Sequence, residues 1–83
     1  GSSLQTKGAT QLLAIVRERA LVAARGGDKA AVSALDSVLP FAQDHTVRLN
    51  WHLARLEVCK EAGDMHAYEQ EQQRLYAFME GKG

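Results

Sequence analysis

Three histidines and one cysteine recur at every seventh position in the second half of the sequence: His45, His52, Cys59 and His66. Imidazole and thiolate groups are the usual ligands of zinc, so this spacing raises the question of a metal site. Residues seven apart on one α-helix are separated by about 10.5 Å along the axis, whereas zinc ligands lie about 2.0 to 2.3 Å from a shared ion. We therefore expect no metal site, and we interpret Cys59 as a small buried apolar residue.

The rest of the sequence offers no nucleophile beside a supporting base, and no glycine-rich loop follows a predicted strand. The pair Gly26 and Gly27 is explained as a helix stop, because glycine adopts the left-handed conformation that closes a helix. We predict that the protein is not an enzyme and that it uses no cofactor and no small-molecule substrate. A metal or redox sensor that combines Cys59 with the histidines is an alternative, which a zinc titration would test.

The composition is that of a folded protein, with 46% hydrophobic and 24% charged residues among 83. A chain of this length holds a single core and therefore one domain. Ten basic and ten acidic residues give a formal charge of zero, which argues against nucleic acid or a membrane surface as the partner. The charge is uneven, because residues 1–60 carry eight basic and five acidic side chains (+3) and residues 61–83 carry two and five (−3).

No apolar run approaches the roughly 20 residues of a membrane span, and no signal-peptide pattern is present. A single cysteine cannot form an internal disulfide, which agrees with a reducing compartment. We therefore expect a soluble, cytoplasmic protein. We interpret residues 1–3 as the remnant of a cleaved tag and residues 4–83 as one helical domain.

Apolar residues at spacings of three and four predict two helices in the first half of this domain. The first covers about residues 9–25 and stops at Gly26 and Gly27. Asp28 is a capping residue for the second helix, which Pro40 ends near residues 39–42. These two helices form a first hairpin over about residues 9–42.

The third predicted helix, about residues 45–62, is apolar on two sides. Val47, Trp51, Ala54, Val58 and Ala62 line one face, and Leu49, Leu53 and Leu56 lie nearly opposite. Asp44 caps this helix, and Gly63 with Asp64 repeats the stop and cap before a fourth helix that ends at Gly81. The second hairpin covers about residues 44–80. We interpret Trp51 as a core residue and the polar run 69–74 as a solvent-exposed face.

The pair of glycine and aspartate occurs at positions 27–28 and 63–64, 36 residues apart, and superposing the two copies places Val22 on Val58 and Leu39 on Leu75. A period of this length is typical of helix-turn-helix repeats. With Trp51, Ala54, Gly63-Asp64 and Ala67 at the matching places, the sequence resembles the tetratricopeptide-like repeats. The resemblance implies an all-α fold of four helices in two stacked antiparallel αα-hairpins. An up-down four-helix bundle is the alternative.

The resemblance also implies a protein-interaction module, such as an adaptor, chaperone or regulatory domain, whose first helix in each hairpin lines a groove for a partner helix or peptide. By their positions on those two helices, the predicted partner-binding residues are Arg17, Leu21, Asn50, Leu53, Glu57 and Lys60.

The alternative function is self-association, as a domain of a larger regulatory or secretion-system protein. It is motivated by apolar residues that four helices cannot all cover, namely Ile15, Val22, Leu49, Leu53 and Leu56, and by the +3/−3 charge distribution.

Overall fold

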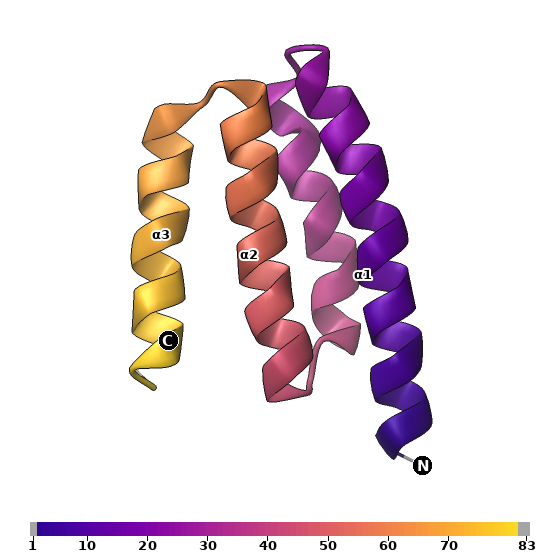
Figure 1. Ribbon diagram of the computed structural model, residues 1–83. Coiled ribbons are helices and arrows are strands. Elements are labelled where there is room, and N and C mark those ends of the chain that lie inside the picture. The colour runs from indigo at the N-terminus through magenta and orange to yellow at the C-terminus, as the bar shows by residue number, and fades with distance from the viewer. Residues whose placement is uncertain (1, 82–83) are drawn as a thin grey trace.

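The computed structural model describes residues 2–81, which form an all-α fold (Figure 1). In that range the chain contains four helices and no strand: α1 (Ser2–Arg25), the 3₁₀ helix η1 (Lys29–Phe41), α2 (His45–Ala62) and α3 (Met65–Met79). Consecutive helices run in opposite directions, so that α1 and α2 point the same way. The predicted all-α class with four helices is therefore confirmed.

The helix stops and caps lie where the sequence placed them. Gly27 and Gly63 adopt the left-handed conformation, with φ of 93° and 76°. The carboxylates of the three aspartates accept hydrogen bonds from the backbone N–H groups that follow them, as helix caps do. These aspartates are Asp28, Asp44 and Asp64.

Helix α1 begins at Ser2, seven residues before the predicted start at Ala9. The prediction began where apolar periodicity begins, but the added turns are not held by burial, since Leu4 is exposed. The Thr10 hydroxyl donates to the carbonyl of Thr6 in this part of the helix, at 2.9 Å. The predicted tag remnant falls partly on this helix, and Gly1 lies outside the described residues.

The second helix is 3₁₀ over 13 residues, tighter than the spacing of its apolar residues had predicted. Two serine hydroxyls, those of Ser33 and Ser37, donate to carbonyls three residues earlier at 2.7 Å. Such bonds compete with the regular α-helical ladder. Pro40 adds to this, since it has no N–H to donate and its ring clashes with the carbonyl four residues earlier in an α-helix. The helix nevertheless buries Ala31, Leu35 and Val38.

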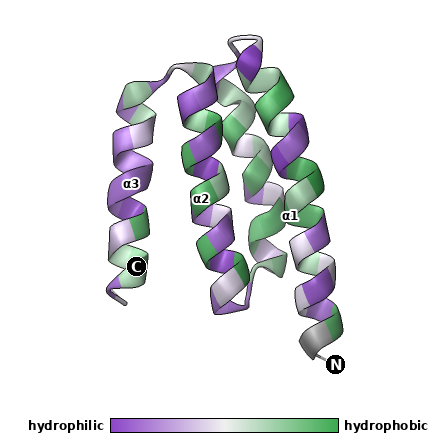
Figure 2. Ribbon diagram, in the orientation of Figure 1, coloured by the Kyte–Doolittle hydropathy of each residue, from purple (hydrophilic) through white to green (hydrophobic). Residues whose placement is uncertain are grey.

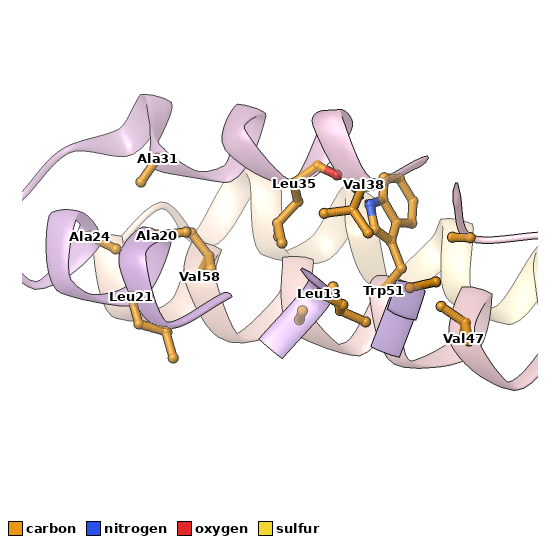
Figure 3. Packing of buried hydrophobic residues seen from close by; sticks show 13 residues of the cluster. Leu13, Ala20, Leu21, Ala24, Ala31, Leu35, Val38, Val47, Trp51 and Val58 are labelled. Carbon is orange, nitrogen blue, oxygen red and sulfur yellow. Dashed lines mark hydrogen bonds between the residues drawn. The ribbon is translucent and has the colours of Figure 1, made fainter. Parts of the chain in front are cut away.

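The main hydrophobic core lies between α1, η1 and α2 (Figure 3). Trp51 is buried there, as predicted, and its indole N–H donates to the carbonyl of Leu35 at 2.7 Å. The side chains that fill this core are Ala9, Leu13, Ala20, Leu21, Ala24, Ala31, Leu35, Val38, Ala42, Val47, Trp51, Ala54 and Val58.

Helix α3 lies at one edge of the molecule and contacts α2 alone among the described helices (Figure 1). The other three helices contact one another, and the Cα trace occupies a thin slab of 39 × 27 × 13 Å. In a closed up-down bundle the first and last helices also touch, and here they do not. Figure 2 shows that the middle of α3 is hydrophilic, whereas α1 and η1 carry most of the hydrophobic residues.

Replacing Trp51 with Phe removes the donor to the Leu35 carbonyl and leaves space in the core. We expect the free energy of unfolding to fall by about 1–3 kcal/mol, measured by urea denaturation. Tyr76→Phe is the control, because this residue is 53% exposed. Equal stability of the two variants would show that the indole bond contributes nothing.

Candidate functional site

Two ion pairs cross between α1 and α2 on the exposed side of the molecule. The guanidinium Nε of Arg17 lies 2.6 Å from Oε2 of Glu57, and further along both helices Arg25 Nε lies 3.7 Å from Oε2 of Glu61. Arg17 also reaches Glu18 at 3.4 Å. The hydrogen bond with Glu57 raises the pKa of Arg17. The structure thus brings Arg17 and Glu57, which are 40 residues apart in sequence, into direct contact.

Leu53 lies on the same side of α2 as Glu57 and is 42% exposed. Asn50 and Lys60 are also exposed, and the spacing of these residues puts all four on one face of the helix. We call the surface formed by Arg17, Asn50, Leu53, Glu57 and Lys60 the α1–α2 surface.

One of the six predicted partner-binding residues, Leu21, does not lie on the α1–α2 surface. Leu21 is only 5% exposed and belongs to the core between the helices. Its position on α1 allowed either outcome, because it borders both the apolar stripe and the exposed face. Its side chain is covered within the chain, and it is not part of the α1–α2 surface.

The α1–α2 surface presents one apolar side chain among charged and amide groups, and it holds no histidine, cysteine or hydroxyl nucleophile. Such a set of groups can bind a polar backbone and apolar side chains.

A buried ion-pair network between α2 and α3 was not predicted. The guanidinium of Arg55 binds both carboxylate oxygens of Glu71, with Nε–Oε2 at 2.9 Å and Nη2–Oε1 at 3.0 Å. Its Nη1 also donates to Asp36 of η1 at 2.7 Å, and Arg74 reaches Glu71 at 3.3 Å. Burial acts to lower the pKa of Arg55, but the bonds to Glu71 and Asp36 raise it overall, so the guanidinium stays protonated.

The position of Glu71 contradicts the interpretation of residues 69–74 as a solvent-exposed face, because Glu71 is only 5% exposed. Two signals in the sequence could have found it. Glu71 is three residues after Tyr68 and four before Leu75, which places it on the apolar stripe of α3. The 36-residue superposition also places it on Leu35, which is fully buried.

The column of residues at every seventh position lies along the boundary between α2 and α3. The rings of His45 and His52 pack on Phe78, with centroids 4.8 and 4.9 Å away. Cys59 is buried, as predicted, and burial raises the pKa of its thiol. His66 is exposed, 3.2 Å from the Gln70 amide nitrogen. Within residues 2–81, no three histidine, cysteine or acidic side chains are placed to share a metal ion.

A separate cavity of about 700 Å³ opens between the first half of α1 and the end of η1. Its walls combine apolar groups with amides and one carboxylate, and its lining residues are Gln5, Thr6, Gly8, Ala9, Leu12, Pro40, Phe41, Gln43 and Asp44. None of the predicted partner-binding residues lines it.

The fold and the α1–α2 surface place the chain in a broad class, that of small four-helix proteins that expose an apolar side chain among charged ones. Comparison with known proteins finds no family model, no curated protein and no solved structure that matches the chain. The resemblance to tetratricopeptide-like repeats therefore stays a prediction based on residues. Across residues 2–81, no helix combines the length and apolar character that crossing a membrane requires.

Removing one partner of the buried Arg55–Glu71 pair should be strongly destabilising. Arg55→Met leaves the Glu71 carboxylate buried without its guanidinium, and we expect a loss of about 3–5 kcal/mol in the free energy of unfolding. The double variant Arg55→Met with Glu71→Leu should lose less than Arg55→Met alone. Urea denaturation in a stabilising osmolyte measures both, and additive losses would show that the two side chains are not coupled.

Protonation of His52 should lower stability as the pH falls. Burial lowers the pKa of His52 below its ordinary value, and the positive charge of Arg48 lowers it further. The unfolded chain therefore binds a proton near pH 6.5, about the ordinary histidine value, while the folded chain resists it. The stability contribution is present above this pH and is lost as the pH falls toward the pKa of folded His52.

Thermal unfolding across this range measures the effect. His52→Phe should unfold with a weaker pH dependence than the unmodified chain, and His66→Phe is the control that replaces an exposed histidine. The assignment fails if His66→Phe, and not His52→Phe, flattens the curve.

Proposed function

We propose that this chain is a protein-interaction module that binds a helix or an extended peptide of a partner on the α1–α2 surface. The observation that carries the proposal is the exposure of Leu53 at the middle of a set of polar and charged side chains. An apolar anchor inside a polar rim is the usual arrangement of an interaction hot spot, because the rim excludes water from the anchor.

The Arg17–Glu57 pair supports this assignment. The 2.6 Å contact holds two long side chains in place before any partner arrives. Ordering of flexible side chains on binding costs about 0.5–1.5 kcal/mol each, so a surface that is already ordered binds with a smaller penalty. Helices α1 and α2 run in the same direction, and the pairs at Glu57 and Glu61 extend the surface along them (Figure 1). A partner segment of linear shape fits such a surface.

A displayed library of about 20-residue peptides tests the proposal, since this length spans about 30 Å when helical. Peptides enriched by the unmodified chain are measured against Leu53→Asp, which places a charge at the apolar centre of the surface. We expect affinity to fall at least about tenfold, a change of 1.4 kcal/mol. Arg17→Glu should weaken the same peptides, because it breaks the pair with Glu57.

Phe41→Asp is the matched control, since Phe41 is exposed and apolar but lies at the end of η1, away from this surface. It should bind the selected peptides as the unmodified chain does. Circular dichroism confirms that each variant is folded. Failure to enrich any peptide, or equal binding by folded Leu53→Asp, would show that the α1–α2 surface is not a binding site.

A further inference from the structure

The outer face of α1 carries three large apolar side chains that no described helix covers. They are Leu4, Ile15 and Val22, of which Ile15 is 55% and Val22 63% exposed. Their spacings of 11 and 7 residues put them on one side of the helix, roughly opposite the buried Ala9, Leu13 and Ala20. We call this set the α1 end face.

The internal repeat indicates what such a face does. Superposing the two copies at 36 residues places Ile15 on Trp51 and Val22 on Val58. Trp51 and Val58 are buried in the core that α2 shares with the two helices before it. Ile15 and Val22 of the α1 end face therefore occupy positions whose counterparts on α2 pack against the two helices that precede α2.

Helix α3 has an exposed apolar face of its own at the opposite edge of the slab. Met65, Tyr76 and Met79 are each more than half exposed, and their spacings of 11 and 3 residues place them on one side of the helix. Because α3 contacts α2 alone among the described helices, this side is open. We call this set the α3 end face.

The charges at the two edges are opposite. Helix α1 carries four basic side chains and one acidic, a net +3, and α3 carries Glu69, the buried Glu71 and Arg74, a net −1. Two of the α1 arginines pair with α2, which leaves Lys7 and Arg19 exposed on α1. Glu69 is exposed on α3. Opposite charges attract across an interface and select its orientation.

We propose that copies of this chain associate head to tail, with the α1 end face of one copy packed against the α3 end face of the next. The partner is a second copy because the chain itself carries both halves of the contact, apolar on each side and opposite in charge. Pairing two α1 end faces would instead set basic helices against each other. The contact joins two different faces, so it is heterologous. An assembly of any length still has one free α1 end face and one free α3 end face, and it can add further copies.

This association uses neither Leu53 nor the rest of the α1–α2 surface, so it is independent of the proposed peptide binding. It also needs no rearrangement of the chain. Ile15 and Val22 occupy positions on α1 that the superposition places on buried positions of α2, and helix α3 stands at the edge away from α1 (Figure 1).

Two double variants test the proposal. Ile15→Gln with Val22→Gln blocks the α1 end face, and Tyr76→Gln with Met79→Gln blocks the α3 end face. Glutamine is neutral and a good helix former, so both variants should remain folded. In sedimentation experiments from about 10 µM to 1 mM, a range suited to weak contacts, the unmodified chain should grow in mass with concentration. Each double variant alone should be a monomer.

An equimolar mixture of the two variants should form a dimer and stop there, because one variant supplies an intact α3 end face and the other an intact α1 end face. Added salt should weaken this dimer. Phe41→Gln, which changes an exposed apolar residue of η1 that belongs to neither end face, should assemble like the unmodified chain.

Leu53→Asp should also assemble normally, which separates this proposal from the peptide-binding surface. A monomeric unmodified chain at 1 mM, well within the reach of weak contacts, would overturn the proposal. So would a mixture that stays monomeric. A variant with a blocked α3 end face that still dimerises alone would show a two-fold contact between α1 end faces instead.

Discussion

The orientation of α3 on α2 depends on the buried contact between Arg55 and Glu71. Helix α3 contacts α2 alone among the described helices, so it cannot draw on the core that α1 and η1 share with α2. Few side chains of α3 are deeply buried, and Leu75 and Glu71 are the two. The bidentate geometry, with both distances near 3 Å, fixes how far α3 is rotated and shifted along α2. A buried pair of this kind adds little net stability but penalises every other register, in which one charge stays buried and unpaired.

The same guanidinium connects α3 to the rest of the fold. Arg55 donates to Asp36 in η1, and its Cζ lies 4.8 Å from the centroid of the Trp51 ring. Trp51 in turn donates to the carbonyl of Leu35. The network therefore joins η1, α2 and α3 through one side chain. Its neighbour His52 lacks such support, because its buried Nδ1 has no hydrogen-bond partner within the described range, and burial keeps this ring neutral.

The sequence alone was sufficient to predict the features that depend on one residue and its immediate neighbours in the chain. Gly27, Gly63 and the capping aspartates were predictable because each acts through its own backbone conformation or through N–H groups two or three residues away. The core face of α2 was predictable because apolar residues repeat at helical spacing. Glu71 was misassigned because residue type suggested solvent, whereas its partner lies 16 residues away in another helix. The contact between Arg17 and Glu57 depends on packing across 40 residues, which periodicity does not encode.

The open arrangement of the helices explains why apolar residues remain exposed at both edges. A closed bundle covers each helix from two sides, but in an open array the first and last helices have a neighbour on one side only. Val22 and Val58, which the 36-residue superposition of the sequence places on each other, illustrate the consequence, since Val22 is exposed in α1 and Val58 is fully buried in α2. The difference arises from position in the array and not from the residue. The exposure of the two end faces therefore follows from the position of α1 and α3 at the edges of the fold. Leu53 is exposed although it lies on the interior helix α2. This difference separates the α1–α2 surface from the two end faces.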